Sequence, residues 1–155
     1  MTQDEKLKKQ VLAFLQNHRT AAIATVSKRN EPQVAAVNYI MDDEFNLFFI
    51  TRKGSRKFEN LEHSKRVGIL VGNDPKVPAV VQIQGNAEIL PDSHYMANFI
   101  SKQIDVNDAQ WWPILKTRGL DFVLFKVTID WLRWLNLDIT GYPQTYMKDF
   151  QQVIP

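Results

Sequence analysis

The sequence contains no cysteine, so disulfide bridges, thiolate zinc sites and thiol nucleophiles are all excluded. It also lacks any stretch that is long enough and uncharged enough to span a bilayer. The first ten residues, MTQDEKLKKQ, carry mixed charges instead of the apolar core of a signal peptide. We therefore expect a cytoplasmic protein with no membrane partner.

Motifs for hydrolysis, phosphate transfer and metal chemistry are also missing. The chain has neither a serine nucleophile elbow nor a Walker loop. His18, His63 and His94 are scattered and do not show the spacing of metal ligands, and each is interpreted as a surface residue. The sequence therefore predicts no metal site and identifies no catalytic side chain.

The composition is that of a folded globular protein. Of the 155 residues, 45% are hydrophobic and 23% are charged, which argues against disorder. A chain of this length can bury a core without covalent links, and we predict a single domain over residues 1–155.

Positive charge is concentrated in one short segment. The chain has a net charge of +2, but residues 51–66 carry six cations and two glutamates, a local excess of +4. A small anionic ligand explains such a compact patch better than nucleic acid, which needs basic residues spread along a face. Few aromatic residues lie between these cations, so we expect no nucleic-acid partner.

The same segment has the pattern of a strand, a turn and a helix start. The apolar run LFFIT ends at Thr51, and Gly54, Ser55, Arg56 and Lys57 follow. Free N–H groups and the dipole at a helix start favour an anion, and the two cations add full charges. The pattern indicates a phosphate site, although an ordinary solvated turn would give the same short motif.

Periodicity predicts a largely β protein. Helical spacing of apolar residues predicts an N-terminal helix over residues 4–17, and a second, late helix is expected over 92–104. Alternating or short apolar runs predict six strands. The strands are expected at residues 21–26, 34–41, 47–51, 67–71, 79–90 and 121–137.

This order of elements suits a mainly β (α+β) fold, a six-stranded antiparallel Greek-key barrel with flanking helices. Gly85 interrupts the longest alternating run and predicts a bulge or bend. Residues 138–155 are expected to form a C-terminal arm over the surface or across a dimer. Trp111 and Trp112 suggest a lid or a subunit contact, with ligand stacking as the alternative.

The last long strand is expected to need cover from outside the chain. Its alternation places Trp131 on the same face as Val123, and beyond it Leu132, Trp134 and Leu135 are apolar on both faces. A second subunit would bury such a strand end. The first two strands are rich in alanine, which leaves room either for tight strand packing or for a flat ligand.

Two stretches of the chain resemble the flavin-binding split barrel of the pyridoxamine 5′-phosphate oxidase superfamily. The first is FFITRKGSRKFENLEHSKRVGILVGN, and the second, a short interval later, is VQIQGNAEIL. That superfamily has, in this order, a strand ending in Thr, a Ser-Arg-Lys helix start, an Asn-Leu pair and a later strand with a Gly-x-Ala-Glu segment. The resemblance extends from about residue 5 to residue 136.

The resemblance implies an FMN cofactor and assigns residues to it. Arg56 and Lys57 match the cations that hold the FMN phosphate, and Ser55 lies beside them. Ile50 and Thr51 match the strand end that lines the flavin, and the ring is expected along the neighbouring strand. The residues of that strand implied to contact FMN are Ala35, Ala36, Val37 and Asn38. In the later strand, Gln82 is a possible substitute for a glutamine that contacts the flavin ring in the oxidase.

The family is dimeric, with the flavin at the subunit boundary, so the resemblance also implies a homodimer. Ala35 and Ile40 replace an Arg and a Lys of the oxidase itself, and WLRWLNLDITGYPQ lacks its C-terminal substrate motif. We therefore predict an FMN-dependent oxidoreductase that is not a true pyridoxamine phosphate oxidase. It would act on an unidentified small substrate, with a reduced nicotinamide as a candidate donor; a non-catalytic flavin or haem binder or sensor is the alternative.

Overall fold

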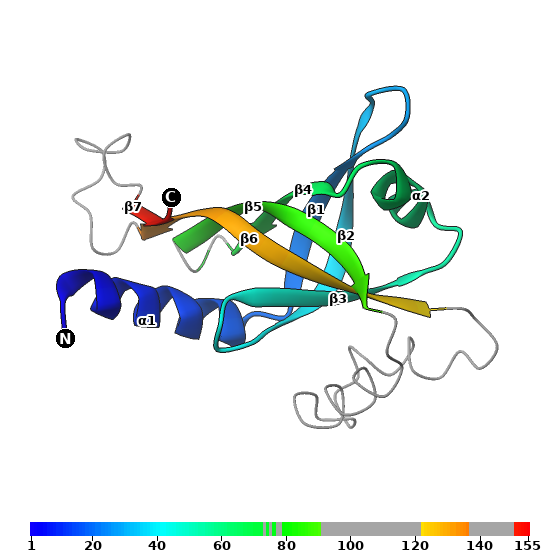
Figure 1. Ribbon diagram of the computed structural model, residues 1–155. Helices are drawn as coiled ribbons and strands as arrows, with labels where there is room; N and C mark the ends of the chain where they lie inside the picture. Colours follow the sequence, from blue (N-terminus) through cyan, green and yellow to red (C-terminus); the bar gives the residue numbers. More distant parts are fainter. Residues whose placement is uncertain (73, 75, 77–78, 91–121, 137–150) are drawn as a thin grey trace.

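The computed structural model describes residues 1–72, 74, 76, 79–90, 122–136 and 151–155. The helix expected over 92–104, the pair Trp111 and Trp112, and most of the C-terminal arm lie outside these residues. The described elements follow one another along the chain as Figure 1 labels them. They are α1 (Gln3–Asn17), β1 (Thr20–Val26), β2 (Pro32–Met41), β3 (Asn46–Arg52), α2 (Arg56–His63), β4 (Arg66–Val71), β5 (Ala79–Leu90), β6 (Phe122–Asn136) and β7 (Gln151–Ile154).

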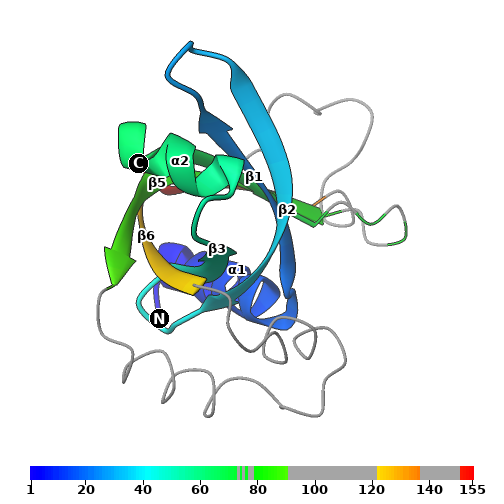
Figure 2. The same cartoon turned by 90° about the vertical axis from the view of Figure 1, so that its right-hand side faces the viewer.

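Six strands close into an antiparallel barrel. The strand order is β3-β2-β1-β4-β5-β6-β7, and β3 also pairs with β6, so the first six strands form a ring (Figure 2). β1, β2 and β3 form a meander, and β4 returns to lie beside β1, which is a Greek-key connection. The mainly β, six-stranded Greek-key prediction is confirmed, and β7 adds a short strand at the edge of β6.

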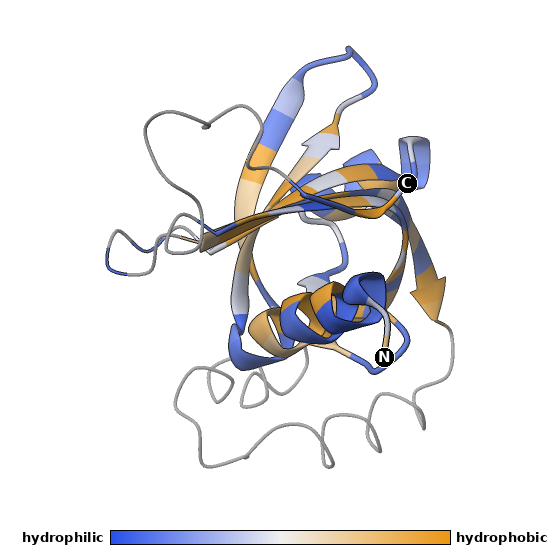
Figure 3. Cartoon of the chain, turned by 90° about the vertical axis from the view of Figure 1, so that its left-hand side faces the viewer, coloured by the Kyte–Doolittle hydropathy of each residue, from blue (hydrophilic) through white to orange (hydrophobic). Residues whose placement is uncertain are grey.

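The barrel interior is apolar and aromatic. Inward-facing residues alternate with outward-facing ones along the strands, as the hydropathy colouring shows (Figure 3). Phe49 and Phe125 stack inside the barrel with ring centroids 5.2 Å apart, and the ring of Phe58 from α2 meets Phe125 edge-on. This packing joins the two strands that close the barrel and attaches α2 to the same core.

Helix α1 packs against the barrel at the end opposite α2 (Figures 1 and 2). It begins with a capping box, in which the Thr2 side chain and Glu5 satisfy each other's backbone N–H groups. Val11 and Leu15 are completely buried in the core. The hydroxyl of Tyr39 in β2 donates a hydrogen bond to the Leu15 carbonyl at 2.6 Å, which attaches the last turn of α1 to the barrel.

The bulge expected at Gly85 is present, and its consequence for β6 corrects one prediction. The register shifts between Gln84 and Gly85, and Asp130 is the unpaired residue on β6. A Cβ at Gly85 would lie 2.5 Å from the Thr128 carbonyl oxygen, so the close approach of the strands requires glycine. Because one extra residue inverts the alternation, Trp131 does not share the face of Val127, contrary to expectation.

The apolar end of β6 is covered by its own chain. Leu132, Trp134 and Leu135 are all at most 4% exposed within one molecule. The ring of Trp134 meets Phe14 of α1 edge-on with centroids 4.8 Å apart, and β7 pairs along the same part of β6. Contrary to expectation, these residues do not need a second subunit for cover, because a helix far away in the sequence supplies it.

Candidate functional site

The segment between β3 and α2 is a tight turn that presents a helix start. Gly54 adopts a φ of +83°, a conformation that other residues rarely take, and the Ser55 N–H donates to the Arg52 carbonyl at 3.1 Å. Ser55 is the N-cap of α2, and its hydroxyl accepts from the Phe58 N–H at 3.2 Å. The sequence pattern of strand, turn and helix start is thus confirmed.

Two hydroxyl groups meet inside this turn. The side-chain oxygens of Thr51 and Ser55 lie 3.1 Å apart, and Thr51 is buried. Either hydroxyl can donate to the other, so this pair can rotate to offer a donor to an anion in front of the helix.

A pocket of about 430 Å³ opens in front of this turn, and we call it the turn pocket. It lies where the outer sides of β1, β2 and β3 meet the start of α2. The turn pocket brings together seven of the ten predicted site residues from three separate segments. Its lining consists of Thr20, Ala36, Val37, Asn38, Ile50, Thr51, Arg52, Ser55, Lys57 and Phe122.

Lys57 supplies a partly buried positive charge to the turn pocket. Desolvation by burial lowers the pKa of its ammonium group below the ordinary lysine value. Arg52, which the site prediction omitted although it lies in the basic segment, also lines the pocket. Removal from water weakens the hydration of the Lys57 charge, so an anion that pairs with it would stabilise the charged form.

A buried amide holds α2 in place beside the barrel. The Asn60 side-chain nitrogen donates to the Thr25 hydroxyl and to the Gln33 side-chain oxygen, each at 3.0 Å. Asn60 and Thr25 are both buried. These bonds join α2 to β1 and β2, so the first turn of α2 keeps its position relative to the strands that line the turn pocket.

The remaining three predicted residues lie outside the lining of the turn pocket. Arg56 is exposed at the start of α2, and Gln82 accepts a 2.6 Å hydrogen bond from Nε of Arg133. Ala35 lines an adjoining hollow of about 500 Å³, which we call the histidine pocket. Its lining consists of His18, Thr20, Ala21, Ala22, Val34, Ala35, Ala36, Leu70, Gly72 and Asp74.

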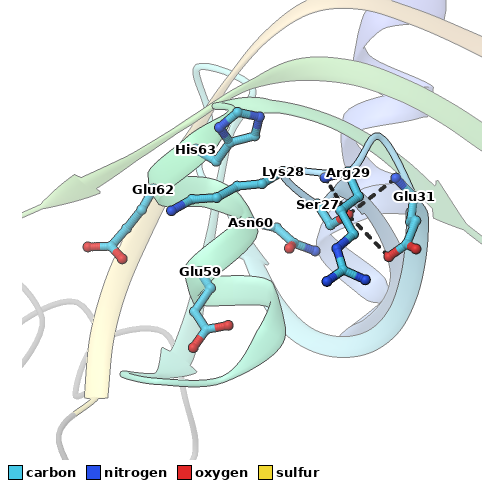
Figure 4. A pocket seen from close by; sticks show the side chains of 8 residues that line it. All are labelled: Ser27, Lys28, Arg29, Glu31, Glu59, Asn60, Glu62 and His63. Carbon is cyan, nitrogen blue, oxygen red and sulfur yellow. Dashed lines mark hydrogen bonds between the residues drawn. The ribbon is translucent and has the colours of Figure 1, made fainter.

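A third hollow, the hairpin pocket, lies between the β1–β2 turn and the opposite side of α2 (Figure 4). Its volume is about 620 Å³, larger than that of the turn pocket. Lys28 and Arg29 share it with carboxylates on both sides, including Glu59 and Glu62. Such mixed charge is less suited to a phosphate than the turn pocket, where the charged lining residues are both cations.

The donor set of the turn pocket fits a phosphate monoester. An ammonium group, a guanidinium group and two hydroxyls surround a helix start, and the Ala36–Asn38 strand offers a flat surface beside it. Within the described residues, no helix is long and apolar enough to cross a membrane. The fold and the pocket therefore define a small antiparallel barrel with a cationic pocket at the β3–α2 turn.

Comparison with known proteins identifies the family of this barrel. Residues 7–136 match the sequence profile described as pyridoxamine 5′-phosphate oxidase. A curated relative, the pyridoxine/pyridoxamine 5′-phosphate oxidase of Proteus mirabilis (strain HI4320), is 34% identical over 107 residues. Those residues are 68% of this chain and 48% of the relative, so the chain spans about half the length of the curated relative it matches. The chain belongs to the pyridoxamine 5′-phosphate oxidase-like family.

Solved structures support the fold. A conserved hypothetical protein of Mycobacterium tuberculosis has a TM-score of 0.70 and 19% identity, covering 93% of this chain and 90% of its own. A heme binding protein of Mycobacterium smegmatis has a TM-score of 0.64 and 17% identity, covering 94% and 55%. The family typically binds FMN, and some members bind haem. At these identities the two structures establish the split barrel.

Proposed function

We propose that this protein binds FMN with its phosphate in the turn pocket and acts as an oxidoreductase. It would move a hydride or electrons between a reduced nicotinamide or similar donor and a small organic acceptor. The single observation that supports the proposal most directly is the convergence of Thr51, Ser55 and Lys57 on one pocket of about 430 Å³. Bound flavin supplies the redox chemistry, while the protein binds and orients it.

The residues of the turn pocket divide into two roles. Lys57 and Arg52 would neutralise the phosphate charge, and the hydroxyls of Ser55 and Thr51 would donate hydrogen bonds to its oxygens. Arg56, exposed one residue earlier in α2, would add charge at the pocket rim. The small side chains along β2 would let the flavin ring approach the strand backbone closely.

Oxidation of pyridoxamine phosphate is not the activity we propose. Ala35 and Ile40 cannot supply the charges that the oxidase places at the start and the end of this strand. The end of β6 and the residues after it also lack the oxidase's basic substrate motif. The small-molecule substrate is therefore a different compound.

Purification and flavin analysis test this proposal. We expect the protein to release FMN on denaturation, and we expect NADH or NADPH to bleach the bound flavin under anaerobic conditions. Arg56→Ala combined with Lys57→Ala should lose most of the flavin while remaining folded. Unchanged FMN affinity in this double variant would contradict the site assignment, and bound flavin that no nicotinamide donor reduces would indicate a passive binder.

We also propose that the protein works as a homodimer with the flavin between its subunits. The outer face of β2 beside the turn pocket leaves Val34 71% exposed next to the small residues of the histidine pocket. A second copy of the chain would bury this face and shelter the flavin ring. Light scattering should give the mass of a dimer, and Val34→Asp should shift the mass towards that of a monomer and weaken flavin binding. A monomeric wild type that binds FMN fully would contradict this arrangement.

Haem binding without catalysis is the second candidate function. His18 lines the histidine pocket, and a neutral imidazole nitrogen is a common axial ligand of haem iron. If haem is the ligand, the purified protein should show a Soret band that His18→Phe removes. A flavin spectrum with no Soret band after haem addition would exclude this candidate.

A further inference from the structure

The turn pocket and the histidine pocket are parts of one groove. Both are lined by Thr20 and Ala36, so they meet on the outer side of β1 and β2. The turn pocket contributes both of its cations at one end, and the histidine pocket contributes His18 and Asp74 at the other. The two ends therefore differ in chemistry: one attracts an anion, and the other offers hydrogen-bond acceptors.

The floor of the histidine pocket is apolar and contains the short side chains of two alanines. Ala22 of β1 lies between Ala36 of β2 and Leu70 of β4 in the strand register. These three residues line the pocket from adjacent strands. A planar apolar ring can lie across such a floor with little steric hindrance.

The ring of His18 contacts the last turn of α1, and this contact determines which ring nitrogen carries the proton. Its Nδ1 lies 2.7 Å from the Phe14 carbonyl oxygen, and its ring packs 4.0 Å from the Phe14 ring. A carbonyl oxygen can only accept a hydrogen bond, so Nδ1 carries the proton in the neutral imidazole. The other nitrogen, Nε2, then carries a lone pair and can accept a hydrogen bond, and His18 lines the pocket.

The groove leads from the phosphate end to His18. From β3 to β1 it crosses two strand spacings, about 10 Å, and His18 lies two residues before Thr20, roughly 7 Å away in the perpendicular direction along the chain, so the direct separation is roughly 12 Å. A phosphate at Ser55 and Lys57 would thus place the far edge of a tricyclic ring near His18. The reverse orientation is disfavoured, because a phosphate in the histidine pocket would face the carboxylate of Asp74.

We propose that His18 binds the flavin ring, with Nε2 accepting a hydrogen bond from the ring imide N–H, N3–H. Oxidised flavin carries this one N–H on its ring, and its other polar ring atoms accept hydrogen bonds, so an acceptor in the protein selects this edge. The inference rests on the proposed FMN site and names the residue that fixes the ring at the end remote from the phosphate. It assigns a ligand contact to a histidine that sequence reasoning treated as a surface residue.

Titration with FMN and with N3-methyl-FMN, which lacks the imide hydrogen, tests this contact. Wild-type protein should bind FMN about tenfold more tightly than the methylated analogue, the effect of one hydrogen bond. His18→Phe keeps an aromatic ring against Phe14 and should bind both flavins with equal, reduced affinity. His18→Gln restores an acceptor and should recover part of the preference for FMN.

Lys57→Ala is the matched control, because it acts at the other end of the groove. It should weaken both flavins by the same factor and keep the preference for FMN. Equal affinities in the wild type, or a preference that persists in His18→Phe, would overturn the role of His18 while leaving the phosphate site intact. Failure of the wild type to bind either flavin would overturn the proposed function itself, so the two failures are distinguishable.

Discussion

The two described helices lie at opposite ends of the same barrel and differ in what their termini do. The first turn of α1 is closed by a capping box, and its last turn is bonded to the barrel through Tyr39. The first turn of α2 instead faces a pocket, with Ser55 as its cap and Lys57 in the lining. One helix satisfies its polar groups internally, and the other leaves donors and charge available to a ligand.

The two helices therefore have different roles: α1 contributes to stability, and the first turn of α2 contributes to ligand binding. Residues that attach α1 to the barrel are buried and have internal partners, so changing them should lower the free energy of unfolding. The first turn of α2 leaves Lys57 in a partly dehydrated position, which favours ligand binding at some expense of stability. Variants at the two ends of the barrel should therefore affect different measurements.

The largest expected effect is at the α1 end. Leu15→Ala removes a completely buried side chain and should lower the free energy of unfolding by about 2–5 kcal/mol. Urea denaturation measures this loss. Leu12→Ala, on the partly buried side of the same helix, is the matched control and should cost clearly less. Equal losses in the two variants would show that α1 does not close the barrel as the structure describes.

The next effect is at the α2 end and changes binding instead of stability. Lys57→Ala removes the partly buried ammonium group and should weaken FMN binding about tenfold or more, since hydrogen bonds to charged groups contribute about 1.5–3 kcal/mol. The thermal midpoint without ligand should stay constant or rise, because a desolvated charge is lost. Fluorescence quenching and thermal melts measure the two quantities.

Lys53→Ala is the control for Lys57→Ala. Lys53 is an exposed cation in the same turn, and it is not part of the pocket lining. It should change FMN affinity less than twofold at physiological salt, because screening weakens exposed charges. If both variants lose affinity equally, the turn attracts the ligand through its overall charge and the pocket has no specific role.

A smaller loss of stability is expected at Tyr39. Burial raises the pKa of its phenol, and Tyr39→Phe would leave the Leu15 carbonyl without its hydrogen bond. Loss of this buried bond should cost about 1–3 kcal/mol in the free energy of unfolding. The preference of the folded variant for FMN over riboflavin should stay unchanged, because the phosphate lies at the α2 end, and a weaker preference would mean that the two ends of the barrel are coupled.

The smallest effect is a pH dependence at the α2 end, measured below pH 10, where the phenol of Tyr39 stays protonated in the folded and the unfolded chain. The pKa of Lys57 is lowered in the folded protein, so between that pKa and the usual 10.5 the unfolded chain binds more protons. Stability without ligand should therefore rise with pH through this window, whereas FMN affinity should fall as the ammonium group loses its proton. Lys57→Gln should remove both slopes, and slopes that remain would point to another group.

Much of the fold could be predicted because its signals are local. Alternation and short apolar runs place each of the six barrel strands within two residues of its observed bounds, whereas β7 was expected to be part of an arm, and Gly85 correctly indicated the bulge. The site prediction also used a local signal, since Thr51, Ser55 and Lys57 are close in sequence. The expectation that this turn lies beside Ala36 and Asn38 came from the family resemblance, because no single segment of the sequence determines the strand order.

What could not be predicted depends on contacts between distant segments. Trp134 is covered by Phe14, which is 120 residues earlier. The change at Asp130 in which residues of β6 face inwards depends on how β6 pairs with β5. Phe122 joins the turn pocket only because β6 closes the barrel against β3, and Thr20 joins it because β1 pairs with β2. His18 carried no recognisable motif, and only the hydrogen bond to Phe14 and the shape of the groove indicate a role for it.

Titration with FMN and with riboflavin tests the central claim most directly, because these ligands share the ring and differ in the phosphate. We predict that the wild type binds FMN at least tenfold more tightly than riboflavin, and that Lys57→Ala loses most of this preference. Equal affinities of the wild type for the two flavins would contradict a phosphate site at the β3–α2 turn.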